Sequence, residues 1–160
     1  MRKINIDEVE EDQWGSPSGK FEGFGKSVSI ALGRDPESMD LVKRHPFDVE
    51  ILRIPPGKKP YPYHSHSAQW EFYHIISGKG RVRDENDEPV PIGSGDAFVF
   101  KPGEAHQLIN DGDEDLVVYV VADNPVGECY YYPDSRKWGL RHPEGRFFRG
   151  DSLDYYDGED

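Results

Sequence analysis

The chain has 160 residues, of which 35% are hydrophobic and 31% charged, with a formal net charge of −12 and a single cysteine. This length fits one domain with a buried core of its own. The absence of a basic stripe argues against nucleic-acid binding, and no apolar run reaches the roughly 18 residues of a membrane span.

The acidic residues are concentrated at the two ends of the chain. Residues 7–12 and 151–160 each carry five acids and no base, so removing these ten charges from −12 leaves −2. Such runs are typical of solvated, mobile tails. The lone Cys129 and the lack of an apolar leader at the N-terminus favour a reducing, cytoplasmic location.

In chain order, the sequence predicts an N-terminal arm over residues 1–26 and then a series of short strands. The first two strands are expected over 27–32 and 47–54. Turn-forming glycine, proline, asparagine and aspartate residues separate the later ones, which are expected at 71–77, 81–83, 89–92, 96–100, 106–110 and 116–122. Short strands at close intervals, with no convincing long helix, predict an all-β barrel or sandwich over 27–123.

A separate C-terminal extension follows over residues 124–150, before the acidic tail of 151–160. Tyr130 to Tyr132 should form a strand. Trp138, Phe147 and Phe148 are too apolar to remain in water, so they pack either on the outside of the same barrel or across a subunit interface. Both alternatives remain open, and we expect a homodimer.

Three histidines and one glutamate lie at a spacing suited to metal ligands: His64, His66, Glu71 and His106. A His-x-His pair on an extended segment places both imidazoles on one face. Glu71 and His106 open two further strands, and they can reach the same point only if the strands curl around it. Three neutral imidazoles and a carboxylate leave coordination positions open, which suits one divalent Mn, Fe, Ni, Co or Zn ion.

This spacing resembles the two motifs of the cupin family. The first motif corresponds to Gly57-KKPYPY-His64-Ser-His66-SAQW-Glu71-FYHIIS-Gly78, and the second to Gly95-DAFVF-Lys101-Pro102-Gly103-EA-His106-QLI-Asn110. The departures are one extra residue after Gly57 and Lys101 in place of a common proline. The resemblance implies an antiparallel double-stranded β-helix, the jelly-roll barrel of cupins, in a single domain that binds metal through these four residues.

Strand alternation adds candidate residues around the metal. Tyr73 shares the face of Glu71 and is the candidate catalytic residue, for proton relay or substrate positioning, whereas His74 should face outward. Tyr61 and Tyr63 flank the predicted mouth and are candidates for substrate binding, although tyrosines also line barrels as packing. His45 and His142 receive no role.

Three functions are compatible with such a site. The first is a metal-dependent enzyme that acts on a small oxygenated metabolite by isomerase or lyase chemistry, in the manner of sugar-phosphate-isomerase-like cupins. The second is an Fe(II)-dependent dioxygenase, and the third is a non-catalytic protein that uses the metal to bind a small-molecule ligand.

Overall fold

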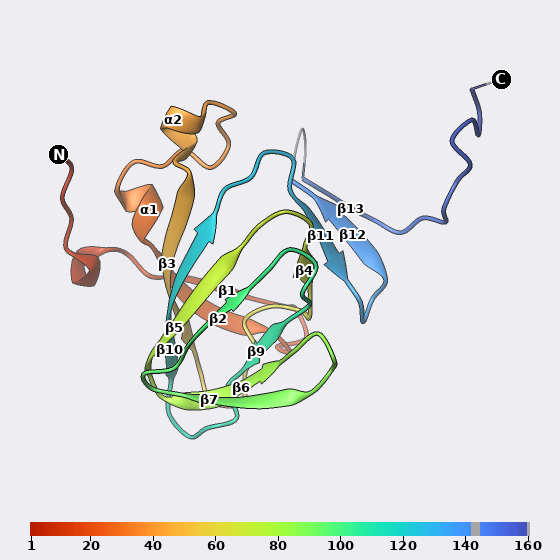
Figure 1. Ribbon diagram of the computed structural model, residues 1–160. Coiled ribbons are helices and arrows are strands. Elements are labelled where there is room, and N and C mark those ends of the chain that lie inside the picture. Colours follow the sequence, from red (N-terminus) through yellow and green to blue (C-terminus); the bar gives the residue numbers. More distant parts are fainter. Residues whose placement is uncertain (142–144, 160) are drawn as a thin grey trace.

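Antiparallel sheets curl into a barrel in the computed structural model, which describes residues 1–141 and 145–159 (Figure 1). The largest sheet has six strands, in the spatial order β1-β2-β3-β10-β5-β8. These are β1 (Asp12–Gly15), β2 (Glu22–Ser27), β3 (Phe47–Ile54), β10 (Leu116–Asp123), β5 (Glu71–Ser77) and β8 (Ala97–Phe100). The predicted all-β double-stranded β-helix is therefore confirmed.

Two smaller sheets complete the described part of the barrel. One contains β7 (Pro89–Gly93), β6 (Lys79–Arg83) and β9 (Gln107–Ile109), and the other contains β13 (Arg146–Phe148), β12 (Lys137–Leu140), β11 (Cys129–Tyr132) and β4 (Ser65–His66). Neighbouring strands in both sheets run antiparallel.

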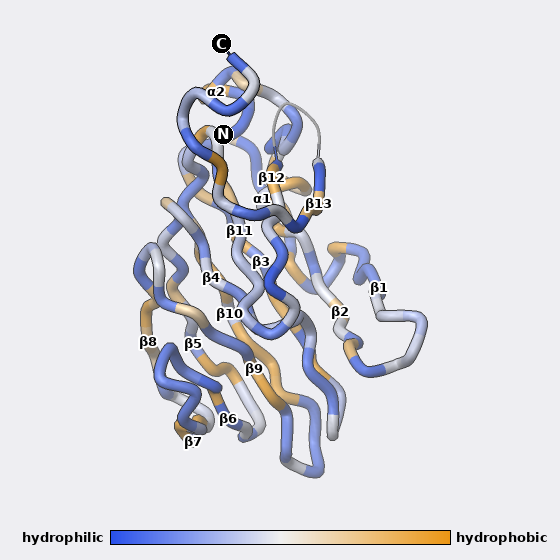
Figure 2. The backbone as a smooth tube through the Cα atoms, turned by 90° about the vertical axis from the view of Figure 1, so that its right-hand side faces the viewer, coloured by the Kyte–Doolittle hydropathy of each residue, from blue (hydrophilic) through white to orange (hydrophobic). Residues whose placement is uncertain are grey.

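The core forms because strand side chains alternate between the two faces. Along β10, the side chains of Leu116, Val118, Val120 and Ala122 are buried and the residues between them are only partly buried. The interior cluster also takes residues from β3, β5, β6, β7 and β9: Leu52, Ile54, Tyr73, Ile75, Val82, Ile92 and Leu108. Figure 2 shows hydrophobic colour along several of these strands and mostly hydrophilic loops between them.

The prediction of a strand over 27–32 is wrong. Strand β2 already ends at Ser27, and the next residues form the single helical turn α1 (Val28–Ala31). The Ser29 hydroxyl accepts a hydrogen bond from the Val49 backbone N–H at 2.6 Å, so the turn is fastened to β3. A second turn, α2 (Leu41–Arg44), and a 3₁₀ turn, η1 (Ile6–Glu8), are the other helical segments in the described residues.

The predicted arm of residues 1–26 carries two strands of the largest sheet, since β1 pairs with β2 and β2 with β3. Its acidic run is not a free tail. Glu11 accepts hydrogen bonds from Arg53 at 3.0 and 2.5 Å, and Asp12 begins β1. The ion pair between Glu11 and Arg53 of β3 supplies the partner that the local sequence could not reveal.

The C-terminal extension returns to the barrel through β11, which pairs with β4 and places the β11–β12 hairpin beside it (Figure 1). Residues 151–159 are exposed and extend away from the barrel. His142, which received no role, lies outside the described residues. No helix in the described ranges is long and apolar enough to cross a bilayer.

Candidate metal centre

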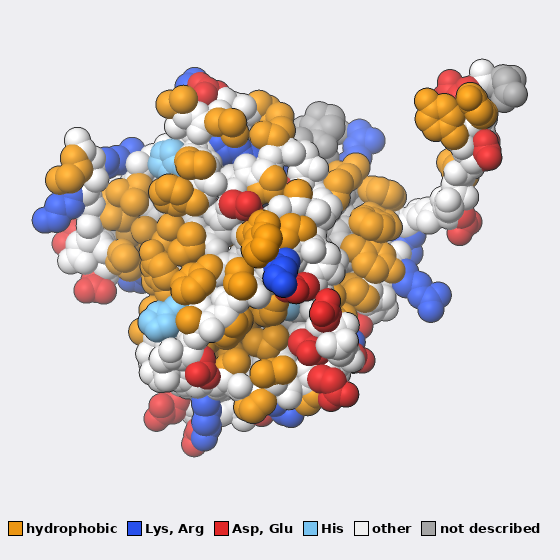
Figure 3. All heavy atoms as spheres, viewed as in Figure 1, with side chains coloured by type: hydrophobic (Ala, Val, Ile, Leu, Met, Phe, Trp, Pro, Cys, Tyr) orange, Lys and Arg blue, Asp and Glu red, His pale blue; other side chains and the backbone are white. Residues whose placement is uncertain are grey.

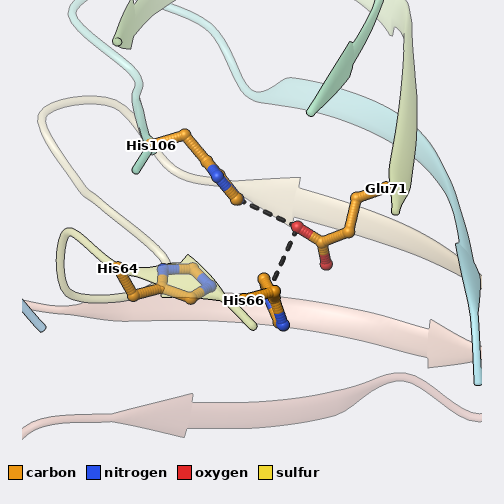
Figure 4. Close-up of side chains that lie close together, drawn as sticks. All are labelled: His64, His66, Glu71 and His106. Atoms are coloured by element: carbon orange, nitrogen blue, oxygen red, sulfur yellow. Dashed lines mark ion pairs between the residues drawn. The ribbon is translucent and has the colours of Figure 1, made fainter. Parts of the chain in front are cut away.

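The four sequence-predicted ligands converge on one point in the structure. Each offers one ligand atom, and these atoms all lie within 4.8 Å of one another (Figure 4). His106 Nε2 lies 2.9 Å from Glu71 Oε2, and His66 Nε2 lies 3.4 Å from the same oxygen. The arrangement has the donor types and the compactness of a single-ion site.

Backbone pairing brings the distant histidine to its partners. His64 and His106 form an isolated antiparallel bridge, with the His64 N–H donating to the His106 carbonyl at 3.2 Å and the His106 N–H donating to the His64 carbonyl at 2.8 Å. The motif glycines lie in turns between strands: Gly57, Gly78, Gly95 and Gly103 all have φ between 73° and 94°. Glycine adopts this left-handed region without the steric cost of a Cβ.

Hydrogen bonds fix which ring nitrogen of two histidines can bind metal. His64 Nδ1 lies 2.9 Å from the Pro62 carbonyl, and His106 Nδ1 lies 3.1 Å from the Glu104 carbonyl. A carbonyl can only accept, so each Nδ1 carries the proton and each Nε2 keeps its lone pair. Burial, followed by the neighbouring His106 and His66, lowers the pKa of His64 to about 3, so this ring is neutral and suited to metal binding.

Buried imidazole nitrogens of the cluster lack hydrogen-bond partners in the described part of the chain, which suits metal binding. Within the described residues, Nε2 of His66 and Nε2 of His106 are buried without a hydrogen-bond partner, although each lies near Glu71. Buried polar atoms normally find partners. Burial by itself would raise the pKa of Glu71, but His106 and His66 outweigh it and hold this pKa at about 2. The carboxylate is therefore ionised, and the donor set suits a divalent metal.

Tyr73 points inward beside this cluster. It is 4% exposed, and its hydroxyl donates to Glu71 Oε2 at 3.2 Å. Burial and the nearby Glu71 carboxylate raise the pKa of Tyr73 well above 10, so the phenol keeps its proton near neutral pH. His74 occupies the opposite face of the strand and takes no part in the cluster.

The two other predicted tyrosines lie in different places. Tyr61 lines the same cavity as His64 and meets that ring edge-on at 6.3 Å between centroids. Tyr63 is buried, but its hydroxyl donates to the Asp84 carbonyl at 2.8 Å and Arg83 stacks on its ring at 3.8 Å. The structure does not bring Tyr63 to the cavity, because these two contacts hold its side chain against Arg83 and Asp84.

A cavity of about 320 Å³ adjoins the cluster. A second hollow of about 100 Å³ shares four of its lining residues, Glu50, Glu71, Val120 and Arg141. The larger cavity is lined by Glu50, Leu52, Tyr61, His64, His66, Glu71, Tyr73, Val120, Tyr130 and Arg141. Its size is at the lower end of small-molecule sites, so it fits a small metabolite.

Glu50 is a cavity residue that the sequence reasoning missed. It shares the inward face of Leu52 and Ile54 on β3, so strand alternation could have identified it. Burial, followed by the charges of Asp48 and Glu71, raises the pKa of Glu50 from 4.5 to about 7.

Glu128 is a second missed residue, and no local pattern indicates it. Its side chain is 2% exposed and accepts hydrogen bonds from the Ser67 and Ala68 backbone N–H groups at 2.8 and 3.1 Å. Its Oε1 also lies 3.4 Å from His66 Nδ1. Burial by itself would lower the pKa of His66, but Glu128 and Glu71 outweigh it and raise this pKa. Glu128 thus holds the outer side of a ligand ring.

Comparisons with known proteins agree with this geometry. Residues 50–122 match the model of the cupin domain family, a segment that contains all four candidate ligands. The oxalate-binding protein of Thermotoga maritima is 37% identical over 65 residues, which make up 41% of this chain and 52% of that protein. The match thus spans about half of the relative's length.

Two solved structures share nearly the whole fold. The sugar phosphate isomerase of the cupin superfamily from Silicibacter pomeroyi superposes with a TM-score of 0.77 at 23% identity, covering 96% of this chain and 98% of that one. A proposed sugar phosphate isomerase from Acidithiobacillus ferrooxidans gives a TM-score of 0.78 at 24% identity, covering 93% and 92%. At these identities the likeness establishes the fold.

Proposed function

We propose that this chain, whose residues 50–122 match the cupin domain family, is a metal-dependent enzyme acting on a small oxygenated metabolite, with isomerase-like or lyase-like chemistry. The observation that carries the proposal is the convergence of three imidazoles and Glu71 on one point beside a small cavity. Ligand sets that leave coordination positions open are typical of catalytic rather than structural sites.

The chain's own residues have distinct parts in this proposal. His64, His66, Glu71 and His106 would hold one divalent Mn, Fe, Ni, Co or Zn ion, which supplies Lewis-acid polarisation of a substrate oxygen when bound. Tyr73 holds a proton beside Glu71, and because its raised pKa keeps the phenol protonated, its hydroxyl acts as a donor to the substrate and not as a base. Tyr61 lines the cavity and positions the substrate.

The structural neighbours favour isomerase chemistry within this range. Two bacterial proteins with the same fold are named for sugar phosphate isomerisation. One fold hosts many reactions. The names of these neighbours therefore support the reaction class and do not identify the substrate.

A second candidate is metal-dependent ligand binding without turnover. It is favoured by the 37% identity to an oxalate-binding protein over 65 residues. An Fe(II)-dependent dioxygenase, the third possibility for such a ligand set, differs from both in its need for oxygen.

Solvent-proton exchange separates these functions. The metal-loaded protein is incubated in D₂O under argon with a panel of aldose and ketose phosphates and hydroxy acids, and NMR follows deuterium at carbons next to the carbonyl. Metal-dependent exchange that is lost in the His64→Ala/His66→Ala variant supports the proposal. A ligand that binds and is recovered undeuterated supports binding alone. In a parallel incubation in air, turnover that requires Fe(II) and oxygen supports the dioxygenase.

A further inference from the structure

The C-terminal hairpin supplies a wall of the cavity that the matched cupin segment does not contain. Tyr130 on β11 and Arg141, directly after β12, both line the cavity, and both lie beyond residues 50–122. Tyr130 also meets His66 edge-on, with 5.2 Å between ring centroids. The hairpin therefore sets features of the site that belong to this chain rather than to the family model.

Arg141 is the one Lys or Arg among the ten residues that line the larger cavity and the seven that line the smaller one. It is partly buried and lies close enough to Tyr130 that its positive charge opposes the burial that raises the pKa of this phenol. It therefore faces the same space as the metal ligands and carries a fixed positive charge there.

The acids that line the two cavities with Arg141 form no ion pair with it in the described ranges. None of the carboxylates in the described ranges forms an ion pair with Arg141 within 4.0 Å. Asp48 is paired instead with the buried Arg34 at 2.7 Å, and Glu71 faces the three imidazoles of the cluster. A guanidinium in a cavity without a carboxylate partner has free donors in a planar fork, which matches carboxylate and phosphate oxygens.

We propose that Arg141, with the Tyr130 hydroxyl beside it, binds an oxyanion at one end of the substrate, so that the substrate class is a small hydroxy-carbonyl or hydroxy-acid compound with a terminal phosphate or carboxylate. This inference rests on the proposed function, since it places the substrate's oxygen atoms at the metal ligands. The anionic end then lies in the same cavity against the C-terminal hairpin. A cavity of about 320 Å³ limits the compound to a few carbon atoms beyond these two ends.

A binding cycle tests this assignment without turnover. Calorimetry at fixed ionic strength measures the affinity of the Zn²⁺-loaded protein for D-glucose 6-phosphate, D-gluconate and D-glucose, in the wild type and in Arg141→Met. We expect the wild type to bind at least one anionic probe roughly tenfold or more tightly than glucose, a preference of the size that one desolvated charge-assisted contact supplies. Arg141→Met should lose this preference, and Arg141→Lys should retain part of it. The two anionic probes distinguish a phosphate from a carboxylate.

Arg81→Met is the matched control, because Arg81 is exposed on β6, pairs with Asp111 at 2.7 Å and does not line the cavity. Its preference should equal that of the wild type. The inference is overturned if the wild type prefers neither anion over glucose, if Arg141→Met keeps the preference, or if Arg81→Met loses it equally. Metal content and the near-ultraviolet spectrum of each variant show that the site is intact. Because calorimetry measures binding only, the anion site can be confirmed even if the protein catalyses no reaction. Proton exchange on neutral sugars alone would support the proposed enzymatic function and refute the anion site.

Discussion

His66 Nδ1 lies 3.4 Å from Oε1 of Glu128, a carboxylate that two backbone N–H groups hold in place. The two residues are 62 positions apart in sequence, and β11 brings them together by pairing Tyr130 with His66. One ring nitrogen of His66 thus meets Glu71 and the other meets Glu128, which orients Nε2 toward the other candidate ligands.

Glu128→Gln should weaken metal binding by roughly 10- to 100-fold, because outer partners of ligating histidines contribute about this much to affinity. Competition with a chromophoric chelator measures the change. Glu85→Gln, at an exposed turn position, is the matched control and should bind metal like the wild type. Equal affinity in both variants would remove Glu128 from the site.

The double variant His64→Ala/His66→Ala should lose its metal, because half of the ligand set is removed and two imidazoles contribute most of the donor strength. Elemental analysis of the purified protein gives the metal per chain. His74→Ala, on the opposite face of β5, should keep the wild-type content. One metal per chain in the double variant would contradict the assignment of these ligands.

Tyr73→Phe keeps the ring in the core and removes only the hydroxyl that donates to Glu71. If Tyr73 donates a proton in the reaction, turnover should fall by about 10²-fold or more with metal content unchanged, which is the usual contribution of general acid catalysis. Steady-state kinetics on the substrate found by proton exchange measures this. Wild-type turnover in Tyr73→Phe would leave the residue as barrel lining.

Glu50 should make the metal-free protein less stable as the pH rises. Below about pH 4.5 the carboxyl is protonated in both states, whereas between about 4.5 and 7 only the folded state holds the proton, because its pKa is raised to about 7. The free energy of unfolding therefore falls through this window. Glu50→Gln removes the penalty and should be more stable than the wild type above pH 7 by about 2–3 kcal/mol.

Urea unfolding at several pH values measures this difference between the wild type and Glu50→Gln. Glu114→Gln, at an exposed position, should follow the wild-type profile. Parallel profiles for the wild type and Glu50→Gln would show that Glu50 titrates like an exposed glutamate.

We also predict a homodimer formed through the C-terminal extension. Trp138, Phe147 and Phe148 remain 42%, 65% and 45% exposed on β12 and β13, and hydrophobic side chains gather there on the molecular surface (Figure 3). Exposed apolar patches often mark interfaces. Sedimentation at micromolar concentration should show a dimer for the wild type and a monomer for Phe147→Ser/Phe148→Ser.

A second apolar face provides the comparison for this prediction. Phe72 on β5 and Val99 on β8 are paired in register and are 42% and 46% exposed. Phe72→Ser/Val99→Ser should leave the dimer intact if the extension forms the interface. A monomer in this variant alone would move the interface to the large sheet, and a monomeric wild type would refute dimerisation.

The barrel and the convergence of the four candidate ligands could be predicted from the sequence, because both depend on local rules. Alternation along strands such as 71–77 separates Glu71 and Tyr73 from His74, and glycines with positive φ mark the turns between strands. The strand expected over 27–32 failed because three apolar residues in alternation also fit one helical turn, and the Ser29–Val49 hydrogen bond decided between them.

Only the tertiary structure decided how the site is enclosed and which charges enter it. The pairing of β11 with β4 brings Glu128 to His66 and Arg141 to the cavity, and Glu11 meets Arg53 across the large sheet. These contacts join residues separated by more than 40 positions, and no period or spacing in the chain encodes them. From sequence alone, a charged residue far from any motif is expected to be solvent-exposed. In the folded protein, pairing between strands places such a residue beside a buried partner.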